Sequence, residues 1–176
     1  MSRHRINRTA LTLSILTGML AAGRASAADE TARAVSPAIT QRRVVVSIPD
    51  RKLAVIEDGE IVTIFQVAVG KPATPSPVGT FTIVNRVANP TYYKTGKVVG
   101  PGAANPVGTR WIGLSEKGYG IHGTDNPRSI GFAKSHGCIR LRNQDVERLF
   151  ERVRTGDVVE LHAERTAEIT RLFGEQ

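Results

Sequence analysis

The only cysteine of the chain lies among residue types that can carry out acyl transfer. Cys138 follows His136 and Gly137, and a second histidine, His122, lies upstream. The thiolate is the nucleophilic form of cysteine, and a free thiol has a pKa of roughly 8.5, so a base is needed near neutral pH. A neighbouring imidazole can accept the thiol proton and later return it to a leaving group. These residues therefore predict a cysteine–histidine site.

The residues around Cys138 fit the rest of such a site. Gly137 leaves space beside the sulfur for a substrate carbonyl and leaves backbone N–H groups available to an oxyanion. Arg140 comes two residues after Cys138, so in an extended segment both side chains point to the same face. Its guanidinium could bind a carboxylate through two hydrogen bonds.

The same residues allow other interpretations. Taken singly, His122, His136 and Arg140 would more often be structural or surface residues. Together with Cys138, the two histidines could also supply three zinc ligands with an open fourth position. We assign no metal, because the only nearby acid that could act as a general base there is Asp125.

This stretch resembles the signature of the bacterial L,D-transpeptidase catalytic domain. The family pattern is a histidine, a gap, and then Ser/Thr-His-Gly-Cys followed shortly by Arg or Asn; here His122-Gly123-Thr124 precedes Ser135-His136-Gly137-Cys138-Ile139-Arg140-Leu141. Three further segments look like family segments: Val69–Pro72, Thr74–Phe81 and Asn105–Leu114. The resemblance covers Val44 to His162, and His162 itself receives no role.

The resemblance implies a β-rich catalytic fold that acts on peptidoglycan stem peptides outside the membrane, without a cofactor. Cys138 would attack the bond between the L-centre of a diamino acid and the terminal D-alanine of a tetrapeptide. The resulting thioester would be resolved by an acceptor amine, giving a cross-link. His122 would be the general base and acid, with the Gly123 carbonyl orienting its ring.

The resemblance also implies roles for the other residues of the motif. His136 and the N–H groups of Gly137 and Cys138 would steady the oxyanion. Arg140 and Ser135 would bind the donor stem. With water in place of the amine the enzyme would be an L,D-carboxypeptidase, and a zinc hydrolase or a non-catalytic wall-binding module are alternatives from other classes. A stem peptide, a lipoprotein lysine, a free D-amino acid and water all remain open as acceptors.

The elements that must position these residues are mainly short strands. Apolar runs at Val44–Ile48, Leu53–Glu57 and Ile61–Val69 predict strands, and Asp58-Gly59 is a two-residue hairpin signal. The segment Asn89–Thr109 is rich in Gly, Pro, Tyr and Asn, and loops of that length are often functional. Further strands are predicted at Gly79–Val87, Arg110–Ser115, Tyr119–His122 and Val158–Leu161.

Helical patterns are fewer. Asn143 is the predicted cap of a helix whose apolar face comprises Val146, Leu149, Phe150 and Val153. A second helical pattern lies in residues 164–176. Strands do not alternate regularly with helices, so we expect a mainly β, β-sandwich-like fold with one or two short helices rather than a doubly wound parallel sheet.

The N-terminus has the three parts of a secretory signal. A basic start is followed by the apolar stretch Ala10–Ala22 and by Ala25-Ser26-Ala27, which has small residues at the positions that signal peptidase needs. We therefore expect a signal peptide at residues 1–27, a linker at 28–43, the catalytic domain at 44–163 and a tail at 164–176.

The composition is that of an ordinary globular protein. The chain has 176 residues, a formal net charge of +8, and 40% apolar and 23% charged residues, which excludes a mainly disordered or collagen-like protein. Four arginines and no acid lie in the leader, so its removal lowers the charge to +4. That charge suits an acidic polymer or an anionic surface and is too low to indicate nucleic acid. We expect a monomer in the periplasm or cell envelope, without stable membrane insertion.

Overall fold

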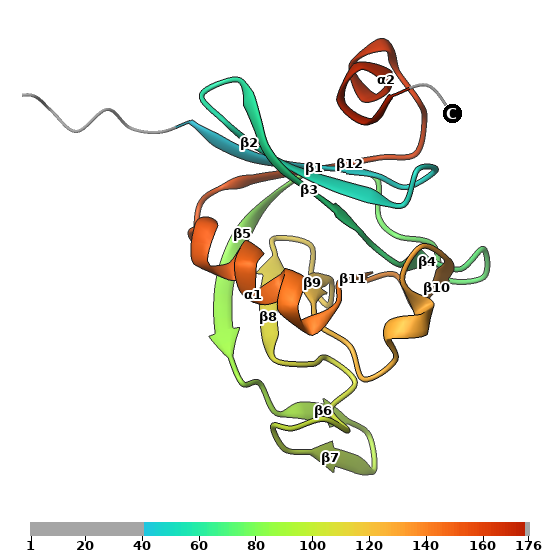
Figure 1. Cartoon of the computed structure of the whole chain (residues 1–176). Coiled ribbons are helices and arrows are strands. Elements are labelled where there is room, and N and C mark those ends of the chain that lie inside the picture. Colours follow the sequence, from blue (N-terminus) through green and yellow to red (C-terminus); the bar gives the residue numbers. More distant parts are fainter. Residues whose placement is uncertain (1–40, 175–176) are drawn as a thin grey trace, which may run out of the picture. The chain divides into compact units, whose positions relative to one another are not determined.

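The strands form one large sheet and two small ones (Figure 1) in a computed structural model that describes residues 41–174. The large sheet has eight strands in the order β11-β9-β8-β5-β12-β1-β2-β3. Its strands are β1 (Arg42–Ser47), β2 (Lys52–Glu57), β3 (Glu60–Gln66), β5 (Gly79–Ala88), β8 (Arg110–Leu114), β9 (Gly120–His122), β11 (Ile139–Arg140) and β12 (Val158–His162). The small sheets pair β4 (Val69–Gly70) with β10 (Ala133–Ser135) and β6 (Tyr92–Lys94) with β7 (Lys97–Val99).

The hairpin between β2 and β3 has the turn that its sequence predicts. Asp58 and Gly59 have φ angles of 51° and 88°. Positive φ at both central residues is typical of a type I′ turn, whose twist matches that of the flanking strands. The two strands pair antiparallel on either side of it, so the expected hairpin is confirmed.

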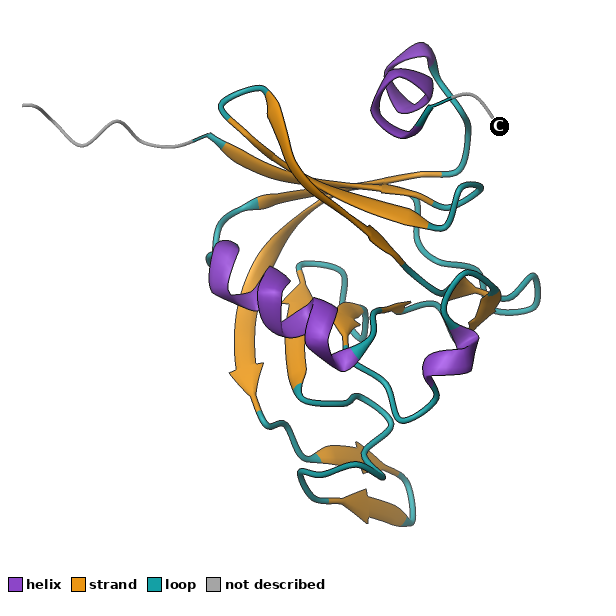
Figure 2. Ribbon diagram, viewed as in Figure 1, coloured by secondary structure: helices purple, strands orange, loops and turns teal. Residues whose placement is uncertain are grey.

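The large sheet curls around the hydrophobic core, and α1 (Asn143–Arg152) packs against the same core (Figure 2). The core joins Val44 and Leu53 on one part of the sheet, Ile112 and Ile121 on another, and Leu149 of α1. Burying such side chains stabilises the fold by roughly 1.5–3 kcal/mol each. The mainly β class is confirmed, and the layers of the expected sandwich are parts of one continuous sheet. A short 3-10 helix, η1 (Pro127–Ser129), precedes β10.

The helical pattern near the C-terminus corresponds to α2 (Ala167–Phe173). The Thr166 hydroxyl accepts a hydrogen bond from the Ile169 amide at 3.3 Å and caps this helix. Ile169 and Phe173 then pack on Val45 and Ile56, on the face of the sheet opposite to the main core. None of the helices within residues 41–174 is long and apolar enough to cross a membrane.

Several element boundaries differ from the expected ones. The single strand expected at Ile61–Val69 is divided, since β3 ends at Gln66 and Val69 belongs to β4 of a small sheet. Strand β1 begins at Arg42 rather than Val44, because the Arg42 guanidinium is paired with Glu57 at 2.9 Å and Asp157 at 3.2 Å. Asn143 is the first residue of α1 rather than its cap, a position that Arg142 takes. The expected signal peptide and the expected linker up to residue 40 lie outside the described residues.

The long segment Asn89–Thr109 contains the β6/β7 hairpin, which the sequence did not predict. One buried side chain anchors the chain on both sides of this hairpin. Asn105 donates through Nδ2 to the carbonyls of Pro90 at 2.7 Å and Gly100 at 3.1 Å. Its Oδ1 accepts from the Val107 amide at 2.9 Å. The hairpin is therefore anchored on both sides of its strands.

Candidate active site

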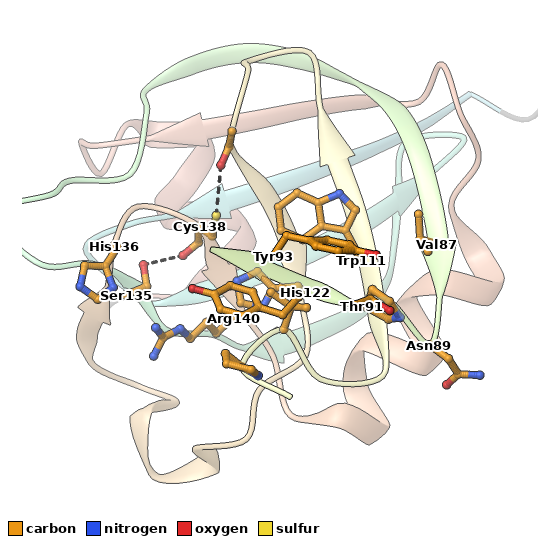
Figure 3. Close-up of a pocket in the computed structure, with 15 residues that line it drawn as sticks. Val87, Asn89, Thr91, Tyr93, Trp111, His122, Ser135, His136, Cys138 and Arg140 are labelled. Atoms are coloured by element: carbon orange, nitrogen blue, oxygen red, sulfur yellow. Dashed lines mark hydrogen bonds between the residues drawn. The ribbon is translucent and has the colours of Figure 1, made fainter. Parts of the chain in front are cut away.

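Most residues of the predicted site line one pocket of about 770 Å³ (Figure 3), namely His122, Ser135, His136, Cys138 and Arg140. Gly123 and Gly137 are not among its lining residues and belong to the backbone around it. The strand end of β9 supplies His122, and the segment from β10 to β11 supplies the rest of the motif. The other walls come from β5, from β8 and the turn after it, and from the chain between β5 and β8, which contains the β6/β7 hairpin. The pocket is lined by Val87, Asn89, Pro90, Thr91, Tyr92, Tyr93, Pro106, Val107, Trp111, Gly118, His122, Ser135, His136, Cys138 and Arg140.

His122 is held in one tautomer. Its side chain is buried, with 5% of the residue exposed, and Nδ1 lies 2.6 Å from the carbonyl oxygen of Gly123. A carbonyl can only accept, so Nδ1 carries the proton and Nε2 keeps its lone pair. Burial, helped by the positive charge of Arg140, lowers the pKa of His122 to about 4. The imidazole is therefore a neutral base at neutral pH.

Asn143 holds the backbone around His122 in place. Its Oδ1 accepts hydrogen bonds from the amides of Thr124 at 3.1 Å and Thr109 at 3.4 Å. A side chain at Gly123 would collide with that oxygen. Asn143 thus joins the start of α1 to the end of β9 and to the loop before β8, a role that its interpretation as a helix cap missed.

Cys138 lies just before β11, and its side chain is partly buried. The Sγ atom donates to the carbonyl of Gly118 at 3.7 Å, and burial raises the pKa of the Cys138 thiol. The resting site therefore holds a neutral thiol and a neutral imidazole. Nucleophilic attack requires that the thiol proton be removed during the reaction.

A buried hydroxyl shapes the loop around the sulfur. Ser135 is fully buried, donates to the carbonyl of Cys138 at 2.6 Å and accepts from the Gly137 amide at 3.0 Å. Gly137 has a φ of 116°, and a Cβ there would lie 2.6 Å from the ring of Tyr119, so the position requires glycine. The Gly137 amide is thus engaged within the loop, whereas residues 41–174 offer no hydrogen-bond partner to the Cys138 amide.

His136 and Arg140 lie in different environments. His136 is exposed at the edge of the pocket, whereas His122 lies at its centre (Figure 3). Arg140 is the direct cross-strand neighbour of His122, and its buried Nε makes no hydrogen bond within the described residues. This guanidinium is available to an anionic group in the pocket. No three His, Cys, Asp or Glu side chains in residues 41–174 are grouped so that they could hold a metal ion.

Sequence reasoning missed three aromatic residues of the pocket. Trp111 stacks on His122, with ring centroids 5.6 Å apart, and Tyr92 and Tyr93 of β6 line the pocket. The signals that could have indicated them were weak. Trp111 belongs to a family-like segment, and Tyr92 and Tyr93 belong to the long segment that was expected to be functional.

Residues 41–161 match the L,D-transpeptidase catalytic domain family YkuD. YkuD of Bacillus licheniformis, provisionally named an L,D-transpeptidase, is 42% identical over 119 residues, which cover 68% of this chain and 64% of that protein. The chain thus spans less than two thirds of that relative. Two crystal structures share the fold with TM-scores of 0.60. An L,D-transpeptidase of Mycobacterium tuberculosis is 23% identical, with 70% of this chain and 58% of that chain covered.

The second crystal structure, that of an Enterococcus faecium L,D-transpeptidase mutant, is 26% identical to this chain. The match covers 69% of this chain and 50% of that chain. The family match extends from the start of β1 to β12 and includes all the residues that line the pocket. The chain therefore belongs to the L,D-transpeptidase catalytic domain family.

Proposed function

We propose that the protein is an exported L,D-transpeptidase that acts on the tetrapeptide stems of peptidoglycan through a thioester on Cys138. One observation carries this proposal: an oriented, neutral His122 and the only cysteine of the chain line one pocket with an arginine whose Nε is unpaired within the described residues. Membership of the family supports a substrate in the cell wall and a location in the cell envelope.

The reaction starts with proton transfer. Nε2 of His122 takes the thiol proton of Cys138, and Sγ attacks the carbonyl carbon of the L-centre that precedes D-alanine. The Cys138 amide donates to the oxyanion that forms. His122 then returns its proton to the departing nitrogen, so D-alanine leaves as the amine and the thioester remains.

The second half-reaction reverses these roles. An acceptor amine attacks the thioester carbonyl, His122 accepts a proton from the amine, and the thiolate departs and is reprotonated. Arg140 binds a carboxylate of the donor stem. Ser135 acts through the shape of the loop, because its hydroxyl is already engaged by the backbone of Cys138 and Gly137.

The walls of the pocket suit a peptide with aliphatic parts. Val87, Val107 and Trp111 contribute apolar surface, and Tyr92 and Tyr93 combine apolar rings with hydroxyl groups. Positive charge is supplied at one end by Arg140. A stem peptide offers the matching features, namely a carboxylate and a long aliphatic side chain.

Incubation of the purified protein with tetrapeptide muropeptides, followed by mass spectrometry, tests this proposal. We expect loss of D-alanine coupled to gain of the acceptor mass. Cys138→Ser should lose nearly all turnover, since an alkoxyl group is a far poorer nucleophile here. A carbapenem, which the family resemblance marks as an acylating agent, should add its mass to the wild type and not to Cys138→Ala.

His162→Gln is the matched control, because His162 lies on β12 outside the pocket and should leave turnover unchanged. Loss of D-alanine without transfer would identify a carboxypeptidase. Turnover that survives Cys138→Ala would rule out the thioester, and turnover that a chelator abolishes would indicate a zinc hydrolase. Binding to peptidoglycan without any reaction would indicate a wall-binding module.

A further inference from the structure

A row of three side chains crosses the sheet beside the sulfur. Trp111 on β8 is directly opposite His122 on β9, and Arg140 on β11 is opposite His122 on the other side. All three line the pocket. The adjacent register pair, Ile112 and Ile121, is fully buried in the core, as expected for side chains that alternate between the two faces of a sheet.

The indole of Trp111 lies nearly parallel to the imidazole of His122. The planes differ by 19° and the centroids are 5.6 Å apart, which is within the range of stacked aromatic pairs. Gly120 precedes His122 by two residues on the same face of β9. A Cβ at Gly120 would lie 2.7 Å from Cη2 and Cζ2 of Trp111. The missing side chain at Gly120 therefore lets the indole lie across β9.

Proton transfer from Cys138 places a positive charge on this imidazole. The titratable side chains that line the pocket together with His122 are Arg140, Cys138, His136, Tyr92 and Tyr93. Of these, the Arg140 guanidinium on β11 lowers the pKa of the imidazole. Trp111 on β8 and Asn143 on α1 are neutral. Burial and Arg140 both disfavour an imidazolium. The face of an indole attracts a cation, most strongly where water is excluded.

We propose that Trp111 is a positioning residue for His122, whose indole face fixes the plane of the imidazole and stabilises the imidazolium formed when Nε2 takes the Cys138 proton. The inference rests on the function proposed for His122 and Cys138. The Gly123 carbonyl fixes Nδ1 and the indole covers one ring face, so Nε2 is the ring atom left free to exchange a proton.

Alkylation of Cys138 by iodoacetamide at neutral pH tests this without a stem peptide, because only the thiolate reacts. Trp111→Leu keeps apolar volume and removes the π face, and it should slow alkylation by about 5- to 30-fold. Trp111→Phe should stay within about threefold of the wild type, because it keeps an aromatic face. Phe132→Leu, the same kind of change at an exposed site outside the pocket, should not alter the rate.

A double-mutant cycle separates this role from a general loss of structure. When His122 is replaced by Ala, Trp111→Leu should have no further effect on alkylation. A wild-type rate in Trp111→Leu, or an effect that persists without His122, would overturn the inference.

If Trp111→Leu shows no cooperative thermal unfolding, Trp111→Met replaces it, because methionine is also apolar and has no π face. Slowed alkylation in Trp111→Met supports the inference, and a wild-type rate overturns it. Failure of the proposed function is distinguishable, since it would appear as alkylation that is insensitive to His122→Ala or as tetrapeptides that are left unchanged.

Discussion

His122 and His136 differ more in environment than in their separation from Cys138 along the chain. His136 is nearer in sequence, yet it is exposed and makes no fixed contact within the described residues, whereas His122 is buried with its Nδ1 held. Loss of a general base costs about 10²–10⁴ in rate. We therefore expect His122→Ala to lower Cys138 alkylation at neutral pH more than His136→Ala does. A larger effect of His136→Ala would reverse the two roles.

The burial of His122 also makes the stability of the fold depend on pH. Its pKa is about 4 in the folded protein and 6.5 in the unfolded chain, so the unfolded chain binds more protons between these values. The free energy of unfolding should therefore fall as the pH drops from 6.5 to 4, by up to ~3 kcal/mol. Urea unfolding at several pH values measures this. His122→Gln should show a weaker dependence, and equal curves for the two proteins would contradict the buried neutral state.

At the level of elements, the β6/β7 hairpin depends on Asn105. Asn105→Ala leaves the buried carbonyl of Pro90 and the amide of Val107 without their partners, which should cost about 1–3 kcal/mol. We expect faster hydrogen exchange in β6 and β7 and a higher KM for the stem peptide. Lys94→Ala, at the exposed end of β6, is the control and should exchange like the wild type. Unchanged exchange in Asn105→Ala would show that other contacts hold the hairpin.

The elements that the sequence predicted best are those specified by neighbouring residues. Asp58-Gly59 determines its turn directly, and the apolar spacing along α1 determines its buried face, since Val146 and Leu149 are fully buried. The β6/β7 hairpin was missed because Gly and Pro surround two strands of three residues each. The stacking of Trp111 on His122 depends on the register between β8 and β9, which arises only when strands pair. The motif thus predicted where the pocket lies. The side chains that fix the positions of its residues could be identified only from the structure.

For the whole molecule, the N-terminus makes the clearest prediction. The basic start, the apolar stretch Ala10–Ala22 and Ala25-Ser26-Ala27 should direct cleavage after Ala27. Sequencing of the protein recovered from the cell envelope should therefore begin at Ala28. The matched control, Ala27→Arg, should block cleavage at this bond. Envelope protein that still begins at Met1 would contradict the prediction.

The position of β12 in the sheet has a consequence for biosynthesis. The last strand of the sheet lies between β1 and β5, and its first pairs include Arg43 with Val158. A growing chain therefore keeps two open strand edges until residue 162 has left the ribosome, and such long-range pairing is slow. Open edges invite pairing with other chains. For the exported precursor proposed above, late completion of the sheet would favour transport across the membrane before folding.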